Sequence, residues 1–205
     1  MSTQPTVYVV DDDRQARDSV CALVRSMGIL ALAFASAEEL LKYLLPSARG
    51  CIVSDVRMDG GMSGDELQAK LNEKQVSIPI ILLTGYAKTA LTVKVMQAGA
   101  VTLLDKPYRE DELWDAIRRA LTLDALRHNE LARRQEIQAS YDQLTPQEVE
   151  VLRGIVAGKA NKQIAKQLDV SLRTIESRRH VIFEKFQVKS VAELVRVVLE
   201  AGIQL

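Results

Sequence analysis

The stretch VYVVDDD, residues 7–13, joins a short apolar run to three consecutive acidic side chains. Further apolar runs rich in Val, Ile and Leu follow at residues 29–34, 51–54, 78–83 and 101–104. They lack strict alternation between apolar and polar residues, which is typical of strands covered on both faces of a sheet. The pattern predicts five buried strands, with the three acids at the end of the first.

Helical stretches separate these runs. They occupy residues 14–27, 65–74, 87–99 and 109–121, and Ser36 with Glu39 forms the capping-box signature of one more helix. Alternating strands and helices predict an α/β doubly wound fold of the flavodoxin-like kind. This is a five-stranded parallel sheet with helices on both faces and right-handed crossovers.

Residues 141–205 show no strand pattern. Four helices are predicted there, at residues 146–157, 161–168, 172–186 and 191–201, with short connections between them. Asp169 and Val170 make a tight turn, and Ser171 caps the helix that follows. The end of the chain is therefore predicted to be an all-α unit.

The segment at residues 124–140 is polar and contains neither proline nor glycine. The helical pattern that starts at residue 109 can run on through it to about residue 137. Two interpretations stay open, a self-associating helix and an exposed solvated one, because the apolar spacing is too sparse for a clear heptad. We expect a first domain at 1–121, a helical linker at 122–142 and a second domain at 143–205.

The composition, with 47% hydrophobic and 26% charged residues, is that of a globular protein with a substantial core. The formal net charge is zero, but residues 159–189 hold 8 basic and 3 acidic residues, a local net charge of +5. Such a stripe attracts a phosphate backbone, and an ordinary solvated helix face can carry the same charge.

Cys21 and Cys51 have no metal-ligand spacing, and we predict that both are reduced, buried thiols. No apolar run approaches the roughly 20 residues that span a membrane. The first residues are polar and lack a signal pattern. We therefore expect a cytoplasmic protein without a membrane partner.

Polar side chains follow four of the predicted strands: Asp11 and Asp12, Asp55, Thr84, and Lys106. If the strand order is 2-1-3-4-5, the acidic ends of the first and third strands converge at a topological switch point. Clustered carboxylates repel one another unless a cation lies among them, and hard oxygen ligands suit Mg²⁺. A screened Asp55 could then attack phosphorus to give an aspartyl phosphate, with Lys106 and Thr84 contacting the phosphoryl oxygens.

Several short motifs occur in order along the first domain, at residues 9–13 (VVDDD), 55–58 (DVRM), 62–64 (MSG), 83–85 (LTG), 98–100 (AGA) and 105–108 (DKPY). Together they resemble bacterial response-regulator receivers, particularly of the FixJ type, over residues 6–121. The resemblance implies Asp55 as phosphoacceptor and a sensor histidine kinase as partner. It also implies Mg²⁺ held by Asp12, Asp55 and the backbone carbonyl of Arg57, with Asp11 acting through water, and a cis Lys106-Pro107 bond.

Two departures from the receiver pattern stand out. The loop at residues 58–62 lacks the family's proline and is one residue longer, so we expect an altered phosphoryl lifetime. The aromatic switch residue of the family is replaced by Leu103, which leaves open how Thr84 couples to the rest of the domain.

The second domain also carries family motifs. Residues 144–152, 161–165 and 168–175 resemble LuxR/NarL-type DNA-binding domains, with a match from about 143 to 203. The resemblance implies that the helix after Ser171 lies in the major groove. Its outward residues are then Arg173, Glu176, Ser177, Arg179 and His180, and the candidates for phosphate contact are Lys162, Thr174, Arg178 and Lys185. Ser177 and Arg178 replace the family's usual Val-His pair, so base preference cannot be carried over.

The sequence thus predicts a transcription regulator, not an enzyme, whose DNA binding is controlled by phosphorylation of Asp55. We expect a homodimer on promoter half-sites, formed on phosphorylation through residues 87–99 and 101–104, with RNA polymerase as a candidate partner. Two alternatives remain. One is a phosphohydrolase with Asp55 as nucleophile, and the other is a phosphotransfer or interaction module without transcriptional output.

Overall fold

The computed structural model describes residues 4–45, 47–86 and 89–205. Its first part contains the predicted parallel sheet, with strands β1 (Thr6–Val10), β2 (Leu30–Phe34), β3 (Gly50–Asp55), β4 (Ile80–Thr84) and β5 (Thr102–Asp105). The strand order is β2-β1-β3-β4-β5, and every neighbouring pair is parallel. The predicted fold class and strand order are therefore confirmed.

Four helices connect the strands: α1 (Arg14–Ser26), α2 (Ala37–Tyr43), α3 (Gly64–Glu73) and α4 (Thr89–Gln97). Their first turns have side-chain caps where the sequence provides them. Ser36 accepts from the Glu39 amide at the start of α2, and Ser63 forms a capping box with Glu66 at the start of α3. Asp13, the third acid after β1, caps α1 and so has a structural role. The predicted start of α4 at residue 87 lies outside the described residues.

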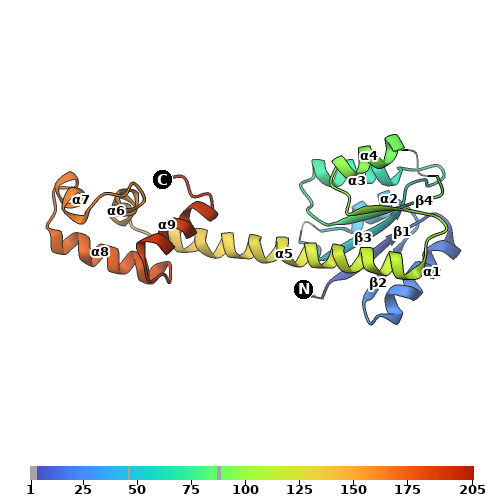
Figure 1. Ribbon diagram of the computed structural model, residues 1–205, viewed down its shortest axis with the longest axis horizontal. Coiled ribbons are helices and arrows are strands. Elements are labelled where there is room, and N and C mark those ends of the chain that lie inside the picture. Colours follow the sequence, from blue (N-terminus) through green and yellow to red (C-terminus); the bar gives the residue numbers. More distant parts are fainter. Residues whose placement is uncertain (1–3, 46, 87–88) are drawn as a thin grey trace. The chain divides into compact units, whose positions relative to one another are not determined.

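Strand side chains alternate between two apolar layers. Tyr8 packs in the layer that contains Leu40 of α2, together with residues of α3 and α4. Val9 packs in the opposite layer, with Val24 of α1 and Ile117 of α5 (Glu110–Asp142). Figure 1 shows the same division, with α2, α3 and α4 on one face of the sheet and α1 and α5 on the other. Coverage of both faces explains why the strands are continuous apolar runs.

The two cysteines are free and buried in this core, as predicted. Burial raises the pKa of both the Cys21 and the Cys51 thiols above the ordinary value. Both thiols are therefore protonated at neutral pH.

Helix α5 continues through the predicted helical linker to Asp142, so the helical pattern that starts at residue 109 does run on past residue 121. The chain divides into two compact units within this helix, between His128 and Asn129. On the first unit, the Arg49 Nε atom lies 2.9 Å from an oxygen of the buried Asp124, so packing extends past residue 121. In the second unit, Ile137 belongs to the core.

The second unit adds α6 (Pro146–Val156), α7 (Asn161–Gln167), α8 (Leu172–Lys185) and α9 (Val191–Glu200). Its helices agree with the four predicted ones. Asp169 makes the turn between α7 and α8 with a φ of 51°, and Ser171 caps α8 through the Thr174 amide. Helices α6 and α7 approach closely at Gly154, where a Cβ atom would lie 2.8 Å from Ile164 Cδ1. Glycine at this position allows α6 and α7 to pack this closely.

Across the described residues, we find no helix with both the length and the apolar character needed to cross a membrane.

Candidate functional sites

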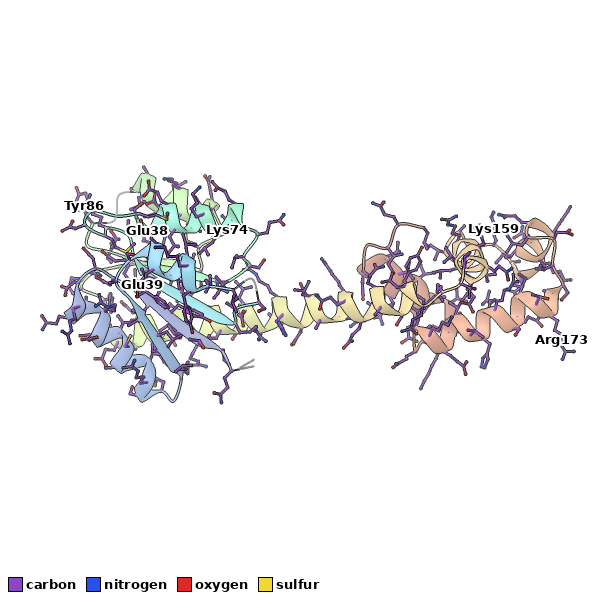
Figure 2. All side chains as sticks on the ribbon, turned by 180° about the vertical axis from the view of Figure 1, so that it is seen from behind. Glu38, Glu39, Lys74, Tyr86, Lys159 and Arg173 are labelled. Carbon is purple, nitrogen blue, oxygen red and sulfur yellow. The ribbon has the colours of Figure 1, made fainter. Side chains whose placement is uncertain are left out.

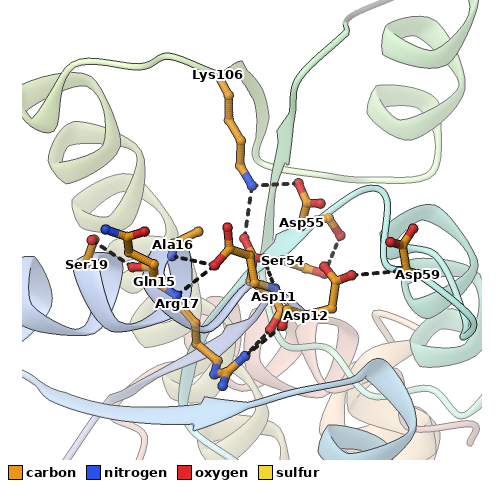
Figure 3. Close-up of polar contacts among 11 residues, drawn as sticks. Asp11, Asp12, Gln15, Ala16, Arg17, Ser19, Ser54, Asp55, Asp59 and Lys106 are labelled. Atoms are coloured by element: carbon orange, nitrogen blue, oxygen red, sulfur yellow. Dashed lines mark hydrogen bonds and ion pairs between the residues drawn. The ribbon is translucent and has the colours of Figure 1, made fainter.

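The acidic side chains gather at the carboxyl edge of the sheet. Because β1 pairs with β3, with Val10 opposite Ser54, the residues that follow or end these strands are neighbours. One carboxylate oxygen from each of Asp11, Asp12 and Asp55 lies within 4.8 Å of the others. Asp11 and Asp55 are 3% and 8% exposed, whereas Asp12 is exposed at the rim. The predicted convergence of three acids is therefore present (Figure 3).

Lys106 reaches this cluster from the end of β5. Its Nζ atom lies 2.9 Å from Asp11 Oδ2 and 3.0 Å from Asp55 Oδ1 (Figure 3). The Lys106 amide donates to the Thr84 carbonyl at 2.6 Å, which ties the residue to the end of β4. The Lys106-Pro107 peptide bond is cis, as the family resemblance implies.

The charges in the pocket do not balance. Desolvation raises the pKa of Asp55, and the neighbouring acids Asp11 and Asp12 add to the rise, so that Lys106 offsets it only in part. Burial alone would lower the pKa of Lys106, but hydrogen bonds to Asp11 and Asp55 raise it. With three carboxylates ionised and one ammonium, the pocket has a formal charge of −2. An all-oxygen donor set with this charge fits a hard divalent cation.

The other predicted residues of this site lie around the pocket. Thr84 is buried, with 2% exposure, and its Oγ1 accepts from the Tyr86 amide at 3.1 Å. Leu103 is partly buried against the apolar layer on the α2, α3 and α4 side of the sheet. The Arg57 side chain is exposed, in the loop that leaves Asp55.

Sequence reasoning did not find the contact between this loop and the acids. The Asp59 amide donates to Asp12 Oδ2 at 2.8 Å, so the lengthened loop is attached to a candidate cation ligand (Figure 3). The signal in the sequence was the extra residue in the loop. Its partner Asp12 follows a different strand, 47 positions before Asp59.

In the second unit, four predicted outward residues of α8 are exposed: Arg173, Glu176, Ser177 and His180. Glu176, Ser177 and His180 lie three, four and seven positions after Arg173, so the four side chains are on one face of the helix. Arg173 projects into solvent near the start of α8 (Figure 2). Beside them, Lys162 of α7 is exposed, and the Thr174 hydroxyl is 2.8 Å from that of Ser171.

Two further predicted contacts, Arg178 and Arg179, make bonds inside the unit. Arg179 Nη1 donates to Asn161 Oδ1 at 2.7 Å, and its guanidinium lies 5.6 Å from the centre of the Phe183 ring. Arg178 Nη2 donates to Gln147 Oε1. Each guanidinium has other N–H groups, so an internal bond does not use up its donors.

Lys185, which was also predicted to contact phosphate, makes contacts inside the second unit. Its Nζ atom lies 2.7 Å from Glu148 Oε2 and 2.9 Å from the Gln143 carbonyl, in a half-buried position. Burial would raise the pKa of Glu148, but Lys185 and Thr145 bonds lower it. Lys185 therefore connects the end of α8 to the start of α6. The sequence could not show this because the partners are 37 positions apart.

Comparisons with known proteins agree with these two sites. The family model described as "Response regulator receiver domain" matches residues 7–118, and the one described as "Bacterial regulatory proteins, luxR family" matches residues 142–198. The response regulator TmoT of Ectopseudomonas mendocina is 40% identical over 95% of this chain and 88% of its own. The transcriptional regulatory protein FixJ of Bradyrhizobium diazoefficiens is 39% identical over 98% of both chains.

Solved structures give the same result. The response regulator StyR matches with a TM-score of 0.87 and 38% identity, over 97% of this chain and 100% of that one. Full-length FixJ from B. japonicum matches with a TM-score of 0.58 and 38% identity, over all of both chains.

The fold and the two sites define a receiver domain followed by a LuxR-type helix-turn-helix DNA-binding domain. The chain belongs to the response regulator family of two-component systems, and it is a transcription regulator. An interaction module without output is excluded because the LuxR-type match covers residues 142–198.

Proposed function

We propose that Asp55 is the phosphoacceptor and that its phosphorylation by a sensor histidine kinase controls DNA binding through α8. One observation carries the proposal: the Lys106 ammonium lies 3.0 Å from Asp55 Oδ1 in a buried pocket that keeps a formal charge of −2. A structural acid at a strand end does not need a half-buried lysine from a strand two positions away.

In the reaction, an Asp55 carboxylate oxygen forms a bond to phosphorus while the bond from phosphorus to the donor's leaving group breaks. For a phosphohistidine donor, the imidazole leaves and takes up a proton from solvent. Lys106 remains beside the transferred group, where its positive charge pairs with the phosphoryl oxygens. The Thr84 hydroxyl accepts from the Tyr86 amide, so its own hydrogen can be donated to a phosphoryl oxygen.

Asp12, Asp55 and the Arg57 carbonyl would hold Mg²⁺, with Asp11 acting through water. The ion would supply positive charge that offsets the repulsion between Asp55 and the phosphoryl group. Asp11 is already bonded to Lys106, which is consistent with its more distant place in this set.

For DNA, we propose that α8 lies in the major groove with Arg173, Glu176, Ser177 and His180 toward the bases. Lys162 and Thr174 would contact phosphate near the α8 N-terminus, and Arg178 and Arg179 would do so with their remaining donors. The regulator would bind promoter half-sites as a dimer, where RNA polymerase can be contacted.

The phosphoacceptor is tested by Asp55→Asn, which keeps the shape of the side chain and removes the nucleophile. Wild-type protein should take up acid-labile label from acetyl phosphate with Mg²⁺, and the variant should take up none. Full labelling of the variant would show that another residue accepts the phosphoryl group. Footprinting of both proteins with and without acetyl phosphate then tests whether phosphorylation controls the protection of DNA.

A further inference from the structure

The loop between β3 and α3, residues 56–63, leaves the phosphoacceptor and is one residue longer than the resemblance predicts. Its base is closed, because the Gly64 amide donates to the Val56 carbonyl at 2.9 Å. Met58, 8% exposed, belongs to the apolar core. The tip that remains, residues 59–62, includes two consecutive glycines, and Gly60 has a φ of +72°. Such a tip has little conformational preference of its own and needs external contacts.

Two carboxylates from other elements provide these contacts. The Asp59 amide donates to Asp12 Oδ2 at 2.8 Å, and the Met62 amide donates to Glu38 Oε1 at 2.8 Å. Glu38 belongs to the first turn of α2, beside Glu39 (Figure 2). The loop tip is therefore held at both ends, once by a proposed cation ligand and once by a residue outside the pocket.

The loop backbone fits closely against Glu38. A Cβ atom on Gly61 would lie 3.4 Å from Glu38 Oε2, at van der Waals contact, so this carboxylate lies directly against the loop backbone. Hydrogen bonds from its own amide and from the Met62 amide lower the pKa of Glu38. The carboxylate is thus a charged acceptor at neutral pH, and charged acceptors form the stronger hydrogen bonds.

We propose that Glu38 is a positioning residue for the cation and phosphoryl site. By holding the Met62 amide, it keeps the lengthened loop in the conformation that places the Asp59 amide on Asp12. The same loop contains Arg57, whose carbonyl is a proposed cation ligand. The inference rests on the proposed function of Asp55 and Mg²⁺. Through Glu38, helix α2 would contribute to the cation affinity and to the lifetime of the phosphoryl group.

The test compares three variants of the full-length chain. Glu38→Ala removes the acceptor, and Glu38→Gln keeps an oxygen acceptor without the charge. Glu39→Ala is the matched control, because Glu39 Oε2 accepts from the Ala35 amide at 2.7 Å and so stabilises the same helix turn without contacting the loop. For each protein we would measure Met62 amide hydrogen exchange without Mg²⁺, the Mg²⁺ dissociation constant by calorimetry, and the half-life of the phosphoryl group.

We expect Glu38→Ala to exchange the Met62 amide about 10-fold faster, since one hydrogen bond to a charged group is lost. Mg²⁺ binding should weaken roughly 10-fold, at the lower end of the range for outer partners of metal ligands. The phosphoryl half-life should shorten, because a looser loop admits water. Glu38→Gln should restore most of each property, and Glu39→Ala should match the wild type.

Equal effects of Glu38→Ala and Glu39→Ala would overturn the proposal, because a weakened helix would then explain both. Normal Mg²⁺ affinity and phosphoryl half-life in Glu38→Ala would overturn it too, while leaving the role of Asp55 intact. If the wild-type chain neither binds Mg²⁺ nor takes label, both the proposed function and this inference fail.

Discussion

Asp55 occupies a position that costs folding free energy when its carboxylate is ionised. Desolvation and two neighbouring acids raise its pKa in the folded chain, and the 3.0 Å contact with Lys106 offsets this only in part. A raised carboxyl pKa favours the folded state while the group is protonated, and this advantage is lost as pH rises through the folded pKa. At neutral pH the ionised Asp55 therefore lowers the free energy of unfolding. The ionised carboxylate is also the form that can act as a nucleophile.

Asp55→Asn should consequently stabilise the chain at pH 7, raising the melting temperature of the first unit by roughly 4 °C for each kcal/mol released. The gain should shrink as pH falls toward about 4, near the pKa of an unfolded aspartate, because wild-type Asp55 becomes protonated. Thermal unfolding by circular dichroism at several pH values measures this. Added Mg²⁺ should stabilise the wild type more than the variant. A variant less stable than wild type at pH 7 would mean that the Lys106 pair outweighs desolvation.

Helix α8 is held in the second unit by polar contacts as well as by apolar ones. Ile175 and Ile182 are fully buried, and Arg179 and Lys185 bond to Asn161 and Glu148 on two other helices. These bonds fix the rotation of α8 about its axis. The face with Arg173, Ser177 and His180 stays exposed, and it is the face that we propose for DNA.

Lys162 and Lys185 should therefore behave differently when each is changed to Ala. Lys162→Ala should weaken DNA binding on all sequences and lower the salt-dependence slope by about one counterion. Lys185→Ala should mainly reduce the stability of the second unit, by roughly 1–3 kcal/mol, because the buried Glu148 loses its partner.

The pH dependence gives a second check on Lys185. Its bond helps to lower the pKa of Glu148, and a lowered carboxyl pKa contributes stability above the unfolded pKa of about 4.3 that is lost as pH falls through the folded pKa. The stability difference between wild type and Lys185→Ala should thus be largest near neutral pH and small in acid. DNA-binding titrations at two salt concentrations, and denaturant unfolding at two pH values, measure the effects of both substitutions. If Lys185→Ala lowers the salt slope and leaves stability unchanged, the ammonium contacts phosphate after all.

Among the helices and strands, the features that could be predicted are those whose sequence signal lies close to them in the chain. Caps such as Ser36 and Ser171 lie next to the helices they start, and both were found from the sequence. The strand order under which the acidic ends were expected to converge is the one observed. The bonds of Asp124, Lys185 and Glu38 join residues 75, 37 and 24 positions from their partners. No periodicity or motif marks such pairs, so the extent of α5 packing, the role of Lys185 and the loop anchor were not predicted.

The whole chain contains two compact units that share one helix, because the division falls inside α5 between His128 and Asn129. Each unit has its own core, and the segment predicted as a helical linker is continuous helix. A single helix-turn-helix offers a limited DNA contact area, so regulators of this architecture gain affinity by binding two half-sites together. Under the proposed function, phosphorylation of the first unit would control DNA binding by changing the association of the chain.

The face proposed for this association is formed by α4 and β5. It carries exposed apolar side chains on α4, where Val93 and Met96 are 48% and 44% exposed. On β5, Leu103 is partly buried. Val93→Asp should disrupt such an interface. Leu30→Asp is a matched control, since Leu30 is 49% exposed on β2, at the opposite edge of the sheet.

Light scattering of the phosphorylated wild type and of Leu30→Asp should therefore give the mass of a dimer, and Val93→Asp that of a monomer. Because Leu103 replaces an aromatic switch residue, part of the wild type should dimerise without phosphorylation. DNA footprints should agree with the measured masses. Dimeric proteins should protect two half-sites, and Val93→Asp should protect the DNA more weakly. Monomers in both phosphorylation states, at concentrations where DNA is bound, would contradict association as the means of control. A dimer of Val93→Asp would place the interface elsewhere on the chain.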